Sequence, residues 1–154
     1  MAIHSSSGTC LSISAALPAT FDAAGFGALT MTTVGELESV GEMVTRRNSG
    51  EFSNLCTGNT SVIKGNRQAM TISVVCALDE DDAGQVLMVA SEASHDNYAF
   101  CVEESNGVKN FFIGTVMAIG KQFGGDTDAV KAPYDIGVQT IPGMTKPILV
   151  VPAP

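Results

Sequence analysis

Hydrophobic and polar residues alternate with a period of two along much of the chain, which is the pattern of half-buried β-strands. The clearest stretch runs from Met70 to Cys76, where every second residue is apolar. Weaker alternations cover residues 9–17, 98–102 and 134–138. The runs 29–34 and 35–41 also favour extended structure. Together these stretches predict about six to eight strands.

One further strand, residues 110–119, is apolar on both faces, with Phe111 and Ile113 on one side and Phe112 and Val116 on the other. The dipeptide Asn106-Gly107 before it is the preferred sequence of a two-residue type I′ hairpin turn. Two apolar faces need two coverings. We expect the core of the domain on one face and a neighbouring subunit on the other.

A single helix is predicted over residues 80–93. Asp79 is the expected N-cap, and the acids that follow it suit the positive first turn. The residues expected to face the core recur at helical spacing: Ala83, Val86, Leu87 and Ala90. The acids do not follow the spacing of a calcium-binding loop, so capping explains them better.

The predicted fold is therefore mainly β: an antiparallel β-sandwich or barrel with one α-helix at about 80–93. Residues 1–142 form the predicted domain. Residues 143–154 contain Pro147, Pro152 and Pro154, which disfavour the interior of a sheet. We expect this segment to be an extended C-terminal tail.

Residues 45–66 differ from the rest of the domain because they are polar and have few apolar anchors. A loop of this length in a compact domain is usually functional or disordered. Half of the eight basic side chains lie in or beside it: Arg46, Arg47, Lys64 and Arg67. An arm that reaches an acidic neighbouring subunit explains both features, and a mobile exposed loop is the alternative.

Composition narrows the function classes. Hydrophobic residues make up 45% of the chain and charged residues 16%, which is consistent with buried subunit contacts or with a large core. The formal net charge of −8 disfavours a phosphate-binding surface. No apolar run approaches the roughly 20 residues of a membrane span, and the N-terminus lacks the pattern of a secretory signal. We expect a protein that stays in the cytoplasm until it assembles.

Residues suited to chemistry are few. The four cysteines, Cys10, Cys56, Cys76 and Cys101, include no C-x-x-C pair. His4 and His95 are the only imidazoles. We therefore expect no metal site, no cofactor and no catalytic site.

Several segments resemble the tail tube proteins of lambda-like, long non-contractile-tailed bacteriophages (siphophages). They are residues 6–9 (Ser-Ser-Gly-Thr), 17–26 (Leu-Pro-Ala-Thr-Phe-Asp-Ala-Ala-Gly-Phe), 34–36 (Val-Gly-Glu), 64–65 (Lys-Gly) and 81–85 (Asp-Asp-Ala-Gly-Gln). The resemblance covers about residues 5–142. We expect no counterpart of the family's second, immunoglobulin-like domain after residue 142.

The resemblance implies a structural virion protein, not an enzyme, that forms hexameric rings stacked into a hollow tail tube. In such tubes, strands from all subunits close a continuous inner β-barrel, a long loop reaches the next subunit or ring, and DNA passes through the lumen during infection. The implied partners are further copies of the chain and tape-measure, terminator and tail-tip proteins. An acidic lumen repels phosphates, and the strand-borne candidates for it are Glu36, Glu38, Glu103 and Asp135.

Three alternatives remain. The tube of a contractile tail or of a type VI secretion system would need no different residues. A small-ligand-binding β-barrel would also show alternating strands. An enzyme acting through carboxylates would need an acid with a raised pKa in a cleft, and no residue in the sequence is distinguished in this way.

Overall fold

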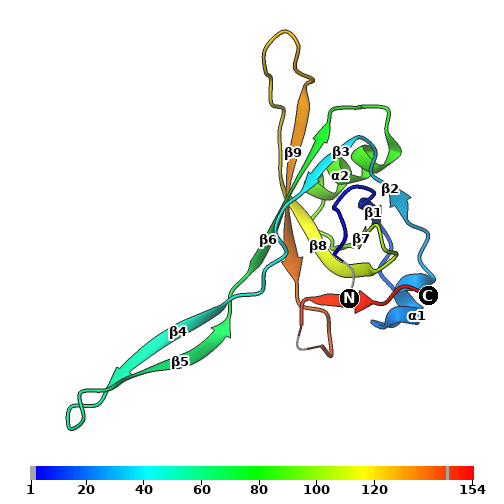
Figure 1. Cartoon of the computed structure of the whole chain (residues 1–154). Helices are drawn as coiled ribbons and strands as arrows, with labels where there is room; N and C mark the ends of the chain where they lie inside the picture. The colour runs from blue at the N-terminus through cyan, green and yellow to red at the C-terminus, as the bar shows by residue number, and fades with distance from the viewer. Residues whose placement is uncertain (1–2, 145) are drawn as a thin grey trace.

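The computed structural model describes residues 3–144 and 146–154, so positions 1–2 of the predicted domain and 145 of the predicted tail lie outside it. Figure 1 shows a rolled sheet with two helices and two long projections. The elements are β1 (Cys10–Ser14), α1 (Ala23–Gly27), β2 (Thr32–Thr33), β3 (Leu37–Val40), β4 (Arg47–Ser53), β5 (Thr60–Arg67), β6 (Met70–Ala77), α2 (Ala83–Ala93), β7 (Tyr98–Glu103), β8 (Lys109–Ile119), β9 (Lys131–Gln139) and β10 (Ile148–Val151).

Eight of the strands form one antiparallel sheet in the order β2-β1-β7-β8-β9-β6-β3, and β10 pairs with the first half of β8. The sheet rolls up, so that β3 returns beside the chain before β1 and a polar cleft lies between them. This architecture confirms the predicted mainly β, antiparallel fold with a covering helix.

The main core lies inside the rolled sheet, under α2. The residues that alternate in sequence along β6 all point into it, because a strand places every second side chain on the same face. Phe100 and Phe112 stack there with ring centroids 5.2 Å apart. Ser91 of α2 is also buried, and its hydroxyl accepts a hydrogen bond from the amide of Val116 at 3.2 Å. This bond fixes the helix to β8.

A second core covers the other face of β7 and β8. Phe111 stacks on Phe26 of α1 at 5.1 Å, and Cys101, Ile113 and Ile141 complete the buried cluster. The short helix α1 lies in a segment predicted to be a loop. The expectation that a neighbouring subunit covers this face is therefore wrong for the first two thirds of β8, which the chain covers itself.

Helix α2 begins three residues later than predicted, and its N-cap is Asp82 instead of Asp79. The Asp82 carboxylate accepts hydrogen bonds from the amides of Gln85 and Gly35, both at 3.0 Å. The bond from Gly35 is a tertiary contact, and it explains why Asp82 is the N-cap and the neighbouring acids are not. The helix start is thereby tied to the turn between β2 and β3.

The predicted buried stripe of this helix is also wrong. The residues that face the core are Gly84, Gln85, Met88 and Ser91, with Leu87 half-buried, whereas Ala83, Val86 and Ala90 are exposed. Gly84 is required because a Cβ there would lie 2.5 Å from the carbonyl oxygen of Thr33. The helix approaches β2 through this glycine, which turns Val86 and Val89 outward.

The connection between β7 and β8 differs from the predicted two-residue turn. The Glu104 amide donates to Val108 O and the Gly107 amide donates to Glu104 O, so residues 105–107 form a three-residue loop. Gly107 has a φ of +89°, whereas Asn106 is not among the residues with positive φ. This geometry is typical of a type I turn followed by a glycine bulge.

Strands β4 and β5 form a separate two-stranded sheet that projects from the body (Figure 1). The segment predicted as an arm or loop is thus a β-hairpin. Within residues 143–154, which were predicted as an extended tail, Ile148–Val151 are the strand β10.

Candidate functional site

Along β3, β6 and β9, no element of the described residues covers the sheet face that points away from the main core. On β6 and β9 the side chains of this face alternate with the core residues, and Ser73 donates a hydrogen bond to Asp135 across the two strands at 2.8 Å. Most of its side chains are short. We call it the open face, formed by Glu38, Ser39, Thr71, Ser73, Val75, Thr115, Met117, Lys131, Pro133, Asp135 and Gly137.

Two of the four acids predicted for a lumen, Glu38 and Asp135, lie on the open face. Glu38 forms an ion pair with Lys131 at 2.8 Å, and this partner raises the pKa of Lys131. Glu36 lies in the turn before β3 with a φ of +55°. Glu103 lies at the end of β7, opposite Lys109. The structure therefore brings only two of the four onto one surface.

The hairpin β4–β5 is exposed along its whole length, and only Gly65 and Arg67 near its base are half-buried. Its register places Gly50, Phe52, Ser61 and Ile63 on one face, with Phe52 57% and Ile63 56% exposed. The opposite face carries Glu51 and Val62. Leu55 in the tip turn is fully exposed.

The four predicted arm cations gather at the base of this hairpin. Arg47 and Arg67 are direct partners in the register, and Lys64 lies opposite Ser49. Arg47 donates to the carbonyl of Gly65 at 3.3 Å, and Arg46 forms an exposed ion pair with Glu42 at 3.8 Å. Like charges opposite one another in a ladder are unfavourable. A nearby acidic surface would offset this cost.

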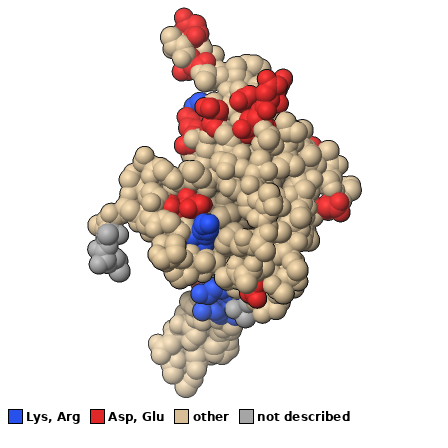
Figure 2. All heavy atoms as spheres, turned by 90° about the vertical axis from the view of Figure 1, so that its right-hand side faces the viewer, with Lys and Arg blue, Asp and Glu red and all other residues tan. Residues whose placement is uncertain are grey.

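Acidic side chains gather at the other end of the molecule, as Figure 2 shows. Two sources supply them. Asp126 and Asp128 belong to the long connection between β8 and β9, and Asp79, Glu80 and Asp81 precede α2. The isolated bridge between Gln122 and Lys131 extends the β8–β9 pair into this connection. The molecule is thus basic at the hairpin base and acidic at the opposite end.

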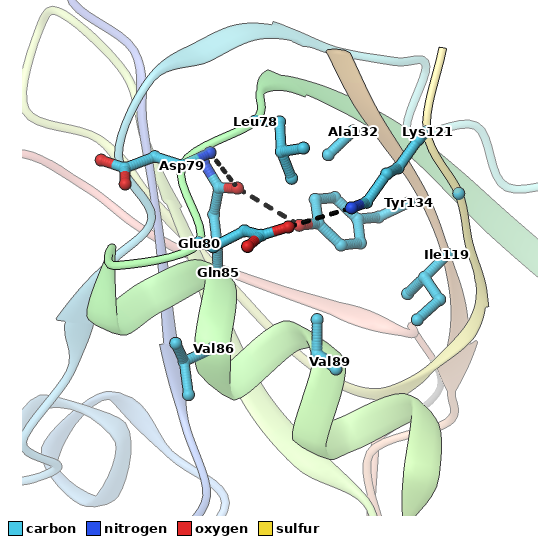
Figure 3. A pocket seen from close by; sticks show the side chains of 11 residues that line it. Leu78, Asp79, Glu80, Gln85, Val86, Val89, Ile119, Lys121, Ala132 and Tyr134 are labelled. Carbon is cyan, nitrogen blue, oxygen red and sulfur yellow. Dashed lines mark hydrogen bonds and ion pairs between the residues drawn. The ribbon is translucent and has the colours of Figure 1, made fainter. Parts of the chain in front are cut away.

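A groove of about 560 Å³ lies between α2 and the ends of β8 and β9 (Figure 3). Val86 and Val89 from the helix and Ile119 from the strand line it. These three side chains are 52%, 47% and 41% exposed. Apolar surface gathered in this way marks a contact site more often than isolated exposed residues do. We call this the helix groove.

Polar groups surround the helix groove. Lys121 and Glu80 form an ion pair at 2.9 Å, and the hydrogen bond from Lys121 lowers the pKa of Glu80. At the floor, the hydroxyl of Tyr134 donates to the side-chain oxygen of Gln85 at 3.4 Å. Burial raises the pKa of Tyr134. The tyrosine therefore stays protonated and acts as a hydrogen-bond donor in the groove floor.

Gln85 connects this floor to the body. Its side-chain nitrogen donates to the carbonyls of Ala77 and Gly35, at 2.9 and 3.2 Å, and its oxygen accepts from the amide of Asp79 at 3.1 Å. A buried amide with all these partners holds its neighbours in place. These hydrogen bonds hold the floor of the helix groove in place.

Chemically reactive groups are not brought together. Among residues 3–144 and 146–154, no group of three or more His, Cys, Asp or Glu side chains is placed to hold a metal ion. Burial raises the pKa of the Cys76 and Cys101 thiols to about 11. The side chain of His4 forms a hydrogen bond with the carboxylate of Glu104 at 2.9 Å. Within the same described residues, no helix has the length and apolar character needed to cross a membrane.

No family model and no curated protein matches the sequence. Solved structures do match the fold. A chain from the sheath/tube terminator of the extracellular contractile injection system PVC in its extended state is 7% identical with a TM-score of 0.69, covering 99% of both chains. A chain from the tail of an empty GTA (gene transfer agent) particle is 11% identical with a TM-score of 0.63, covering 89% of this chain and 95% of that one.

A chain of the SPP1 tail tube is 14% identical with a TM-score of 0.58, covering 84% of this chain and 72% of that one. At these identities the likeness concerns the fold alone. The chain therefore has the fold found in tail tube and injection-system proteins.

The helix groove was not predicted from the sequence. The signal for it was present, because Val86 and Val89 are apolar residues three apart on a helix. Pattern reasoning assigned Val86 to the core, since an apolar residue in a helical stripe is usually buried. The structure shows that Gly84 and Gln85 are the buried residues, so the side of the helix that carries Val86 and Val89 faces outward.

Proposed function

We propose that this chain is a structural subunit that assembles with copies of itself into stacked rings, forming the hollow tail tube of a phage-like particle. The observation that carries the proposal is the hairpin β4–β5, an exposed two-stranded projection on a chain with a tail-tube fold. A two-stranded hairpin is marginally stable alone in water. It gains a role when a neighbouring subunit covers it.

The open face supplies the lumen in this proposal. Its side chains are mostly short, and its two acids outnumber its single base, Lys131, which is paired with Glu38. Duplex DNA binds proteins chiefly through cations that neutralise phosphates. A wall with Asp135 and Glu38 and no unpaired base lets DNA pass without being held.

The finer features of the proposal are those of a siphophage tail. Six copies form each ring, in keeping with the C6 symmetry of the GTA tail to which the fold is similar. Strands β3, β6, β9 and β8 of all copies close a continuous inner β-barrel, which removes the free edge of β3. Tape-measure, terminator and tail-tip proteins are the partners. The subunit is made in the host cytoplasm and ends in the virion tail.

The test is negative-stain electron microscopy of the purified protein at increasing concentration, with sedimentation velocity on the same samples. We expect hollow rings or tubes together with a large sedimenting species. A species that stays monomeric at every concentration would contradict self-assembly. It would favour the alternative of a small-ligand-binding β-barrel, with the helix groove as its pocket.

A second candidate is a tube terminator or cap. It is favoured by the near-complete coverage of both chains in two matches, the PVC sheath/tube terminator and the tube-terminating cap of the anti-feeding prophage (AFP), where 99% of this chain and 95% of that one align. The same micrographs separate the two candidates. A terminator forms single rings that do not stack, whereas a tube subunit grows into tubes of variable length.

The contractile and non-contractile versions of the tube differ outside this chain. A contractile tail and an injection system of the PVC kind have a sheath around the tube. A sheath gene next to the gene for this chain would favour the contractile alternative. A tail operon without a sheath gene would favour the siphophage tail that the sequence resembles.

A further inference from the structure

The helix groove offers a site for an apolar partner, because Val86, Val89 and Ile119 line it and each is about half exposed. Burying such side chains contributes about 25 cal/mol for each Å² removed from water. The chain has a second exposed apolar surface, on the hairpin face that carries Phe52 and Ile63 and at the tip residue Leu55. The two surfaces are chemically matched.

The hairpin of the same copy does not fill the groove, since it projects from the opposite end of the body (Figure 1). A second copy can bring its hairpin to the groove if the copies are arranged head to tail. Such a contact is heterologous, and a heterologous contact that does not close into a ring continues along an axis as an open filament. It therefore suits a growing tube and not a closed dimer.

The charges at the two ends of the molecule favour a head-to-tail arrangement of the copies. In a head-to-tail arrangement, the basic hairpin base meets the acidic end of the next copy (Figure 2). Arg47, Lys64 and Arg67 then lie near Asp126 and Asp128 of the β8–β9 connection. The like charges of Arg47 and Arg67, which are unfavourable in the isolated chain, gain acidic partners.

The length of the hairpin also fits the length of the β8–β9 connection. The seven residues of β4 span roughly 23 Å at the usual rise of a strand. The eight residues from Ile119 to Asp126 span at most about 29 Å when extended. A hairpin lying against the β8–β9 connection can therefore place its cations beside Asp126 and Asp128 and its apolar end at the groove beside Ile119.

We propose that the helix groove is the receptor for the β4–β5 hairpin of a second copy of this chain, with the Phe52 and Ile63 face in contact with Val86, Val89 and Ile119. This inference rests on the proposed self-assembly and adds the site, the face and the direction of the contact between layers. One copy then presents its hairpin to the next while its own groove receives the hairpin of the copy before it.

The experiment uses disulfide trapping in the full chain. Cys10 and Cys56 are exposed, so Cys10→Ser and Cys56→Ser define the background. Cys76 and Cys101 remain, because their buried thiols have pKa values raised to about 11 and stay protonated at pH 8. Into this background we introduce Phe52→Cys together with Val89→Cys. A disulfide forms only when the two Cα atoms come within about 7 Å.

The matched control pairs Val62→Cys with Val89→Cys. Position 62 is on the same hairpin, one strand across, and is 73% exposed, but it points to the opposite face. A second control pairs Phe52→Cys with Val150→Cys, since Val150 is an exposed valine on β10 with 57% exposure. Each protein is assembled, mildly oxidised and run on a non-reducing gel, and a duplicate is examined by electron microscopy.

We expect the 52–89 pair to give a ladder of linked chains, several-fold more abundant than in either control, because each copy carries both halves of the contact. Tubes without this ladder, or a ladder equally strong in the 62–89 control, would overturn the inference while leaving the tube proposal in place. A ladder without rings or tubes would support the contact and contradict the tube. If neither forms, both proposals fail.

Discussion

Strands β5 and β6 follow one another in the chain with two residues between them, and each has eight residues. Their surroundings differ completely. In β6, every second side chain is buried, and β9 and β3 pair with its two edges. In β5, the side chains are exposed almost throughout, and within the part of the chain that the structure describes it pairs with β4 alone.

The difference teaches that equal strand length does not imply equal local stability. β6 is stabilised by burial of its side chains as well as by the hydrogen bonds of its ladder. β5 is stabilised only by its backbone hydrogen bonds with β4. Each such bond replaces a hydrogen bond with water, so its net contribution to stability is only about 0.5–1.5 kcal/mol. The body is ordered by its own core, whereas the order of the hairpin depends on what it contacts.

The largest effect is expected from removing the hairpin. The amide of Gln68 donates to the carbonyl of Arg46 at 2.9 Å, so the two ends already face each other. Replacing residues 47–67 with an Asn-Gly turn should leave the body folded, with a cooperative unfolding transition in urea, and should abolish tubes in electron micrographs. Normal tubes from this variant would remove the hairpin from the assembly mechanism.

A paired substitution measures the difference in burial directly. Ile72→Ala in β6 removes a fully buried side chain and should lower the unfolding free energy by about 2–5 kcal/mol. Ile63→Ala in β5 changes a residue that is 56% exposed and should alter it by less than about 0.5 kcal/mol. Urea denaturation of the monomer gives both values, and equal losses would contradict the contrast between the strands.

The N-cap of α2 gives a smaller effect within the body. Asp82→Ala loses the bonds to the Gln85 and Gly35 amides and should lower the unfolding free energy by about 1–2 kcal/mol. Asp81→Ala, one residue earlier and exposed, should change it by less than about 0.5 kcal/mol. A loss as large for Asp81 would contradict the assignment of the N-cap to Asp82.

The smallest effect is expected from the ion pair beside the groove. Lys121 holds the pKa of Glu80 below its ordinary value. A depressed carboxyl pKa stabilises the fold above the unfolded pKa of about 4.3, and this stabilisation is lost as pH falls through the lower folded pKa. Glu80→Gln should therefore lower stability slightly at pH 7. The loss should shrink as pH falls through the lowered folded pKa of Glu80, because the carboxyl then becomes protonated in the folded state as well. A loss that persists at low pH would point to packing instead of charge.

The sequence predicted the strands with one buried face well. The alternation in Met70–Cys76 and in residues 134–138 became β6 and β9, because a half-buried strand needs an apolar residue at every second position. The hairpin strands were not predicted as strands. Their ladder comes from backbone hydrogen bonds, and no core imposes an alternation on their side chains.

The helix shows a different limit. Its existence followed from the spacing of apolar residues, but its buried face did not, since Gly84 and Gln85 are poor candidates for a core. They are buried for reasons that need the tertiary structure: close approach to Thr33 for the glycine, and bonds to Gly35, Ala77 and Tyr134 for the glutamine. The error concealed the helix groove, because Val86 was assigned to the core.

The irregularity in β8 has a geometric consequence for two surfaces at once. Val116 lies opposite Ile136 and Ala118 lies opposite Asp135, so Met117 is an extra residue in the ladder, a β-bulge. Without it, a strand of the same length would turn Ile119 toward the open face and Ala118 toward the helix. The bulge thus shifts the alternation of side chains between the two faces of β8 by one residue. It lets a single strand end supply Met117 to one wall of the molecule and Ile119 to the other.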